Sequence, residues 1–355
     1  MDKEARIKDV VGKIFSLDRS KFVFVYTPPK VGSTTLVTSL RLSLSDQYNI
    51  IHIHDDIMLS VLTGINDITV NEIIDYVSRH YNSVYVIDVY RSPVERKMSE
   101  FFEKVSPYHF NNSEDNINRY NVDRVIKRFN KLFPYLGNGD HYTEKYGLSN
   151  IPAFDFEKYY TLQKVGNTNY VKLRLIDSNK WGYILSGIFG RDIVIVSDYQ
   201  TQNKRISGLY DKFKQAYKLP SNYIDMIKNC KYFKFYYSES EQVNYLRDLK
   251  QTSAFQPYTR AEYDFYVVLY LENQVYNDIQ VDHYIDCGCI CADCRAKRAY
   301  LFKRAKGGER ITERVVHSEC VEARKSTQII RKIVRVKQKQ KCLNDKMSQK
   351  FSLMG

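Results

Sequence analysis

The chain has 355 residues, enough for one large domain with an appendage, and 43% of them are hydrophobic, so a buried core can form. The formal net charge of +13 is concentrated at one end: residues 287–355 hold 18 lysines and arginines against 6 acidic residues, whereas residues 1–286 are close to neutral. No apolar run approaches the length of a membrane-spanning helix, and residues 1–16 are charged and amphipathic, so we expect neither a transmembrane segment nor a signal peptide.

Apolar residues in the first hundred positions switch repeatedly between helical and strand-like spacing. The helical spacing predicts helices over residues 4–16, 34–44, 70–80 and 93–104. Short runs rich in β-branched and aromatic residues predict strands over residues 22–26, 49–54 and 84–90. Strands that alternate with helices in this way predict an α/β fold with a parallel sheet flanked by helices.

The pattern is less regular after residue 104. Residues 105–150 are polar and rich in Asn, Tyr and Gly, and we expect them to cover the site. Further strands are predicted over residues 170–176 and 192–196, and helices over residues 203–217 and 240–250. Residues 261–279 favour a helix, although their Tyr and Val content leaves a strand open.

A glycine-containing turn follows the first predicted strand. Residues 27–29 are Thr-Pro-Pro, and the chain then continues into the helix over residues 34–44. The first turn of a helix has unpaired N–H groups and the positive end of the helix dipole, so a strand–turn–helix junction is a phosphate site. Cationic, hydroxyl and backbone donors are contributed there by Lys30, Val31, Gly32, Ser33, Thr34 and Thr35.

A second candidate anion site follows the strand over residues 84–90. Arg91 ends that strand, and Ser99 lies eight positions further on, within the next helix. Two anion sites at neighbouring strand ends suit a nucleotide with phosphates at both ends. A nucleoside triphosphate P-loop is the alternative, but it needs Gly-Lys-Ser/Thr, and here Lys30 precedes Gly32. A Pro/Gly turn with incidental hydroxyls is the other alternative.

Together, Lys30-x-Gly-Ser-Thr-Thr35 and Arg91-Ser-Pro-Val-Glu-Arg-Lys-Met-Ser99 resemble the two nucleotide motifs of sulfotransferases that use 3′-phosphoadenosine-5′-phosphosulfate (PAPS). The resemblance is clearest over residues 20–100, continues weakly through residues 171–177 and is not seen beyond about residue 250. Leu36 stands where the cytosolic small-molecule enzymes usually carry Trp, so the resemblance leans toward the carbohydrate and capsular-polysaccharide type.

This resemblance implies a P-loop-related three-layer fold and transfer of a sulfuryl group from PAPS to a hydroxyl of a carbohydrate acceptor. Residues 30–35 would hold the 5′-phosphosulfate, and Arg91 and Ser99 the 3′-phosphate. With no leader or membrane span predicted, we expect a cytoplasmic protein, in the host cytoplasm if the chain is viral.

Sulfuryl transfer requires cationic stabilisation of the leaving phosphate and a base for the acceptor hydroxyl. Lys30 is the expected electrostatic catalyst. His52 and His54 lie on one face at the end of the strand over residues 49–54, and we favour His54 as the base because it is closer to the strand end, with His52 and Asp55 behind it. Core packing of His52 and a turn-capping role for His54 fit the sequence equally well.

Three further cations are candidate ligands for an acidic acceptor, although solvation on a helix face or strand edge would explain them equally well: Arg96, Lys172 and Arg174.

Five cysteines gather where the basic part begins. In a chain without a leader, clustered cysteines indicate a metal site rather than disulfides. The spacing predicts a structural Zn²⁺ bound by Cys291, Cys294, His317 and Cys320, with Cys287 and Cys289 as alternative or additional ligands. Reduced thiols without metal are the alternative. Gly307 and Gly308 between two alternating runs predict a hairpin, so the pattern resembles a treble-clef zinc finger.

Three segments follow from these observations: a sulfotransferase-like α/β domain over residues 1–282, a small zinc-binding α+β module over residues 283–330 and a basic tail over residues 331–355. Residues 287–341 would bind nucleic acid or another polyanion. The alternative function is therefore a catalytically degenerate sulfotransferase fold that binds a polyanion through its zinc module and tail.

Overall fold

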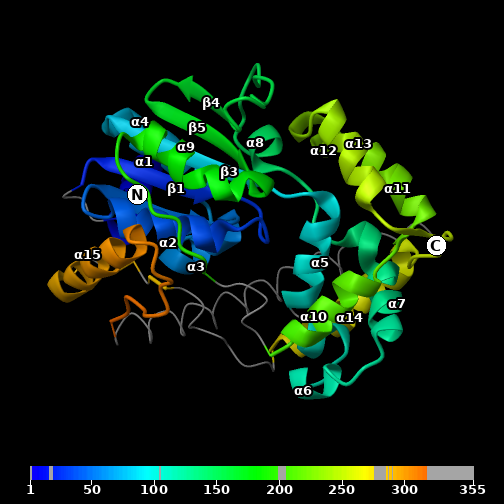
Figure 1. Ribbon diagram of the computed structural model, residues 1–355. Coiled ribbons are helices and arrows are strands. Elements are labelled where there is room, and N and C mark those ends of the chain that lie inside the picture. The colour runs from blue at the N-terminus through cyan, green and yellow to red at the C-terminus, as the bar shows by residue number, and fades with distance from the viewer. Residues whose placement is uncertain are drawn as a thin grey trace, which may run out of the picture.

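A computed structural model describes residues 2–15, 19–103, 105–198, 205–275, 285–286, 288–289 and 291–317. The chain forms an α/β body around a five-stranded sheet, and a helical lobe lies beyond one end of the strands (Figure 1). The predicted class, a mostly parallel sheet flanked by helices, is confirmed. No helix in these ranges is both long enough and apolar enough to cross a membrane.

The strand order in the sheet is β2-β1-β3-β5-β4. Strands β1, β2, β3 and β5 are parallel, and β4 runs antiparallel to β5 at one edge. The bounds are β1 Lys21–Tyr26, β2 Tyr48–Ile53, β3 Ser83–Tyr90, β4 Tyr160–Val165 and β5 Thr168–Arg174. The parallel register places Tyr26 beside Ile53, so the C-terminal ends of β1 and β2 lie level.

Helices cover both faces of the sheet. Successive side chains of β1 point to opposite faces of the sheet: Phe22, Phe24 and Tyr26 pack in one core, while Val23 and Val25 pack in another. The first core includes α1 (Lys3–Ile14), α3 (Asp56–Thr63) and α4 (Val70–His80), and the second includes α2 (Ser33–Leu44) and α9 (Trp181–Phe189). The body therefore has three layers.

The helical lobe has its own, strongly aromatic core. Residues 105–150, which their polarity predicted to cover the site, supply much of this core, because Phe129, Leu132 and Phe133 are fully buried. The polar residues of this segment occupy the outer faces of short amphipathic helices. The lobe's elements are α5 Pro93–Glu103, η1 Val105–His109, α6 Glu114–Ile117, α7 Val122–Leu132, η2 Phe133–Tyr135, α10 Ser207–Ala216, β6 Leu219–Pro220, α11 Ser221–Lys228, α12 Lys231–Tyr236, α13 Glu239–Asp248, β7 Gln251–Thr252 and α14 Arg260–Val275. Helix α8, His141–Glu144, packs on the body instead, because Tyr142 lies in the first core.

The strand predicted over residues 192–196 does not form. Alternate backbone N–H groups of this segment instead donate to hydroxyl oxygens along α2: Val194 to Ser43 at 3.2 Å, Val196 to Ser39 at 3.0 Å and Asp198 to Thr35 at 3.3 Å. The three hydroxyls are spaced four residues apart, so they form one stripe on the helix. This stripe satisfies donors that a strand would have paired with a neighbouring strand.

The predicted hairpin around Gly307 and Gly308 is wrong. The chain from Ala292 to Lys306 forms a helix, α15, and the two glycines follow its C-terminal end. Its Ala, Leu, Lys and Arg content favours helix, and Cys294, Arg298 and Leu301 form a single buried stripe. The domain boundary near residue 283 and the tail over residues 331–355 lie outside the described ranges.

Candidate functional site

The sheet reverses its strand order at β1. β1 lies between β2 and β3, so the connection from β1 to β2 leads to one side and the connection from β2 to β3 crosses to the other. In parallel α/β sheets, ligands bind beyond the carboxyl ends of the strands at such a switch point. The turn after β1 and the residues after β3 flank this position, which is where both predicted anion motifs lie.

The turn between β1 and α2 has an unusual backbone. Lys30 has φ of 69° and Gly32 has φ of 88°, both in the left-handed region. At position 32 the positive φ would strain any residue with a Cβ, and that Cβ would also lie 2.7 Å from Leu175 Cδ1. Lys30 is not a glycine, so its left-handed backbone conformation is strained. Such strain is often found at ligand-binding turns.

Arg91 is bonded directly to this turn. Its Nη1 donates to the Lys30 carbonyl oxygen at 3.0 Å, and Lys30 Nζ lies 3.4 Å from Glu103 Oε1 on α5. Ser99 is buried on the same helix, one turn before Glu103. The structure thus brings Lys30 and Arg91 together, and a ligand anion that binds Lys30 would compete with the Glu103 carboxylate.

The hydroxyls at the start of α2 have different surroundings. Thr35 Oγ1 donates to the Asp198 carbonyl oxygen at 3.2 Å, and Ser33 is buried. Thr34 is half-buried, as are Lys30 and Gly32, whereas Val31 is buried in the core. The Thr35 hydroxyl therefore holds the segment that ends at residue 198, while the backbone N–H groups of this first turn retain the anion-binding geometry of a helix start.

The candidate histidines meet the turn after β1. His54 Nδ1 lies 2.6 Å from the Thr27 carbonyl oxygen, so Nδ1 carries the proton and donates it. The His52 and His54 rings are 4.5 Å apart, and His52 is the more buried. His141 Nε2 donates to the His54 carbonyl oxygen at 2.7 Å, and burial lowers the pKa of His141. In neutral His54 the hydrogen bond to Thr27 leaves Nε2 as the basic nitrogen.

A buried charge network that sequence reasoning missed supports the same edge of the sheet. Lys172 Nζ on β5 donates to Asp88 Oδ2 on β3 at 2.7 Å and also to Asp140, the N-cap of α8. Asp88 accepts from Thr27 Oγ1 at 2.5 Å, and Asp140 accepts from the Tyr236 hydroxyl at 2.8 Å. Desolvation opposes ionisation of Asp140, but the Lys172 ammonium outweighs it and lowers the pKa of that carboxyl.

Two of the three cations considered as ligands for an acidic acceptor therefore form ion pairs within the protein instead. Lys172 belongs to the network above, and Arg174 donates to Asp177 at 2.6 Å and to Glu241 at 2.7 Å. The sequence analysis did not single out Asp88, because its neighbours in β3 are apolar. A lone carboxylate within an otherwise apolar strand does, however, indicate a buried cationic partner.

A candidate metal centre lies at the start of α15. The sulfurs of Cys289, Cys291 and Cys294 lie within 4.8 Å of one another. Sulfurs bound to one tetrahedral zinc ion are about 3.8 Å apart, so this cluster can hold a metal ion with small adjustments. The backbone N–H of Cys294 lowers the pKa of Cys291, which favours the thiolate that metals bind.

The cluster includes Cys289, expected as an alternative or additional ligand, beside the predicted Cys291 and Cys294. His317 is described but is not part of this three-sulfur group. Cys287 and Cys320 lie outside the described residues, so the structure does not place them.

Comparisons of the chain with protein-family models, with curated proteins and with solved structures find no match. The resemblance to PAPS-dependent sulfotransferases therefore depends on the two nucleotide motifs themselves.

Proposed function

We propose that this chain binds PAPS at the carboxyl edge of its sheet and transfers the sulfuryl group to a hydroxyl, with a carbohydrate as the acceptor. One observation carries the proposal: the Lys30 turn and Arg91, which the sequence places some sixty residues apart, meet at the switch point of the sheet and are joined by a hydrogen bond of 3.0 Å. A nucleotide with phosphates at both ends suits two cationic groups placed in this way.

In the proposed reaction, the acceptor oxygen attacks sulfur, and the bond between sulfur and the bridging phosphate oxygen breaks. Lys30 and the first turn of α2 stabilise the negative charge that grows on the leaving phosphate. His54 Nε2 takes the acceptor proton, because Nδ1 is already the donor to the Thr27 carbonyl oxygen. The products are the sulfate ester and adenosine 3′,5′-bisphosphate.

Calorimetry with adenosine 3′,5′-bisphosphate on the full chain tests the nucleotide site. We expect micromolar affinity, and a loss of about 2 kcal/mol of binding free energy in Arg91→Ala, because a charge-assisted contact is removed. Arg79→Ala is the matched control, since Arg79 is exposed on α4 and pairs with Glu4 and Asp75 instead.

ATP serves as the competing ligand, because a triphosphate P-loop would prefer it. Tighter binding of ATP than of the bisphosphate, or equal bisphosphate affinity in Arg91→Ala and wild type, would contradict the proposal. Because Arg91 also holds the Lys30 carbonyl oxygen, melting curves of each variant separate lost contacts from lost folding.

We also propose that the cysteine cluster holds a structural Zn²⁺ and that the basic C-terminal part binds a polyanion. The observation that favours this second function is α15, which begins at the cluster and exposes Lys297 and Lys303. Other cations of the same helix are engaged in ion pairs: Arg298 with Asp286, Arg304 with Glu309 and Lys306 with Asp192. Binding to heparin or to a DNA duplex should weaken steeply with salt, and Lys297→Glu with Lys303→Glu should abolish it.

A further inference from the structure

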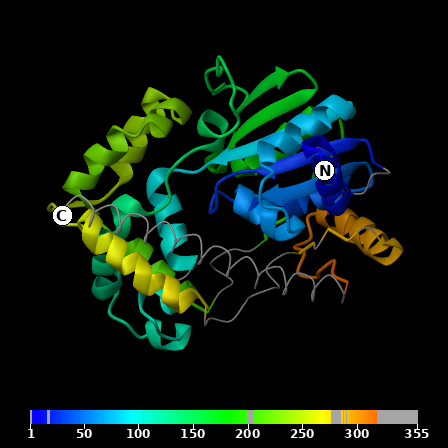
Figure 2. The same cartoon turned by 180° about the vertical axis from the view of Figure 1, so that it is seen from behind.

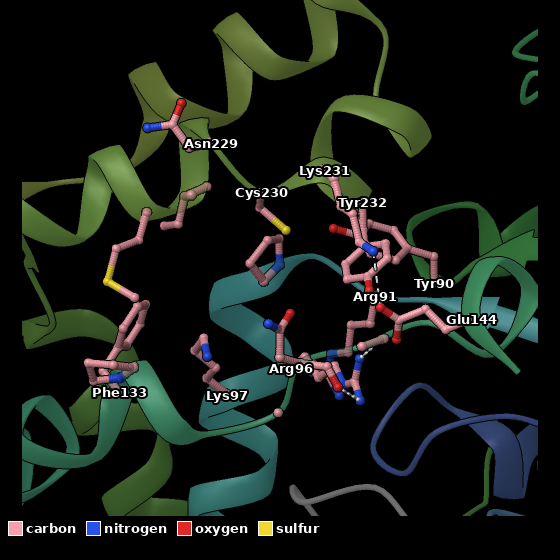
Figure 3. A pocket seen from close by; sticks show the side chains of 17 residues that line it. Tyr90, Arg91, Arg96, Lys97, Phe133, Glu144, Asn229, Cys230, Lys231 and Tyr232 are labelled. Atoms are coloured by element: carbon pink, nitrogen blue, oxygen red, sulfur yellow. Dashed lines mark hydrogen bonds and ion pairs between the residues drawn. The ribbon is translucent and has the colours of Figure 1, made fainter. Parts of the chain in front are cut away.

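A pocket of about 420 Å³ lies where the sheet meets the helical lobe. One wall is the end of β3 and the first turns of α5, and the facing wall is the junction of α11 and α12 (Figure 3). Arg91, Arg96 and Lys97 line the first wall, and Cys230, Lys231 and Tyr232 line the second. A volume of this size matches sites for small organic ligands.

Three of the lining cations have no direct carboxylate partner: Arg96 and Lys97 are buried, and Arg91 is half-buried. Within the described ranges, no acidic group forms a direct ion pair with Arg91, Arg96 or Lys97, although Glu95 contributes an attractive charge to Arg91, and Glu100 contributes one to Arg96 and Lys97. Lys231, which is exposed at the mouth, pairs with Glu144 at 3.1 Å.

Three other buried cations in the described residues have carboxylate partners. Lys172 has two carboxylate partners, Arg174 has two, and Arg298 has Asp286. Burying an unpaired charge is costly, so proteins normally supply a counter-ion. The lining of this pocket holds one carboxylate, Glu144, which pairs with Lys231 and leaves Arg91, Arg96 and Lys97 without a direct counter-ion.

The same walls carry buried polar atoms that no described residue satisfies: the Tyr90 hydroxyl, Arg91 Nε and Arg96 Nε. Tyr90 and Arg96 are each 5% exposed. The other nitrogens of Arg96 donate to the Asn138 and Gly139 carbonyl oxygens at 3.0 and 2.7 Å, which fixes its guanidinium in place. Burial raises the pKa of Tyr90, so its hydroxyl stays protonated and available to donate.

We propose that this pocket binds a second ligand through an oxyanion, a carboxylate, phosphate or sulfate group, which accepts from Tyr90, Arg91 and Arg96 and supplies the missing counter-charge. Desolvation lowers the pKa of Lys97 to about 8, and a bound oxyanion would favour its charged form.

The pocket adjoins the proposed nucleotide site through Arg91, whose Nη1 contacts the Lys30 turn while its Nε is left for the pocket. If the turn holds PAPS, the ligand here is an acceptor that carries an acidic group. That identification rests on the proposed function, whereas the oxyanion site itself does not.

Titration of the full chain with inorganic sulfate, phosphate and malonate, each at constant ionic strength, tests the site. Tyr90→Phe is the informative variant, because it removes one hydroxyl oxygen that has no described partner. We expect it to keep the melting temperature and to weaken oxyanion binding about fivefold to tenfold. Tyr142→Phe is the matched control: its hydroxyl is also buried without a described partner, but it does not line the pocket.

Arg96→Lys keeps a positive charge but loses Nε, and we expect it to weaken oxyanion binding at least tenfold. Absence of binding by all three anions, or equal affinities in Tyr90→Phe and wild type, would overturn the site. Binding of adenosine 3′,5′-bisphosphate, measured in parallel, reports on the proposed function separately, because Tyr90→Phe should leave it unchanged. Oxyanion binding that depends on Tyr90 in a chain that does not bind the bisphosphate would support the pocket and refute the nucleotide site.

Discussion

Lys97 shows what burial does to a single side chain. Its Nζ donates to the Leu136 carbonyl oxygen and lies 5.2 Å from the centre of the Phe133 ring, and desolvation lowers its pKa from 10.5 to about 8. Below pH 8 the folded protein must keep a buried ammonium, which destabilises it relative to the unfolded chain. Above pH 10.5 the side chain is neutral in both states, and this penalty disappears.

Lys97→Met should reveal this titration. Between pH 8 and 10.5 the unfolded chain binds more protons at this position, so the free energy of unfolding of wild type should rise relative to that of the variant as pH increases. Denaturant unfolding of both proteins at pH 7, 9 and 10.5 measures the difference. A difference that stays constant across this range would mean that Lys97 keeps an ordinary pKa.

The second prediction for a single residue concerns His54. His54→Asn places an amide nitrogen near the position of Nδ1, so the hydrogen bond to the Thr27 carbonyl oxygen can persist while the base is lost. Release of adenosine 3′,5′-bisphosphate from PAPS with a polysaccharide acceptor should slow about a hundredfold or more. Bisphosphate affinity should not change. Full activity in His54→Asn, with loss of activity in His52→Asn, would move the base to His52.

At the scale of elements, the Asp88–Lys172–Asp140 network joins β3, β5 and the start of α8. All three side chains are almost fully buried, so removing one charge leaves another without its partner. The network also fixes Thr27, the first residue after β1, through the 2.5 Å hydrogen bond to Asp88. We infer that it sets the position of the Lys30 turn relative to β3.

Asp88→Asn should therefore lower the free energy of unfolding by about 3–5 kcal/mol, the usual cost of breaking a buried ion pair from one side. Asp46→Asn is the control, since Asp46 pairs with Arg191 on the surface, and its loss should cost less than about 1 kcal/mol. Urea unfolding at pH 7 measures both. Similar small losses in the two variants would show that the network contributes little to stability.

At the scale of the whole molecule, the C-terminal part is packed onto the body. Leu301 and Cys294 of α15 share a core with Leu42 of α2 and with Val196, and both views place α15 beside α2 (Figures 1 and 2). The backbone N–H of Ile285 also donates to Asp198 at 2.7 Å. The described residues of this part therefore share a core with the body.

Metal removal should therefore destabilise the body as well as the cysteine segment. We expect about one zinc per chain. Treatment with a chelator should lower the melting temperature of the whole protein and reduce its free energy of unfolding by several kcal/mol. In Cys291→Ser the chelator should have no further effect, whereas Cys230→Ser, in the helical lobe, should behave as wild type. Reductant-protected protein without metal, or an unchanged melting curve after chelation, would contradict a structural metal.

The sequence by itself determined the local elements and the strand–turn–helix motifs. Helix α4 has the predicted bounds, 70–80, because its apolar residues repeat at helical spacing and Thr69 caps it. The Lys30 turn and Arg91 were recognisable because strand ends, glycine and charge are local signals.

Only the tertiary structure decided which distant groups meet. Asp88, Asp140 and Lys172 come from different segments, and no spacing rule links them before the sheet order is fixed. Residues 192–196 have strand composition, yet a stripe of hydroxyls on α2 took the place of a neighbouring strand. Burial and long-range pairing depend on the whole fold, so only the tertiary structure shows the pocket in which Arg91, Arg96 and Lys97 lack a direct counter-ion.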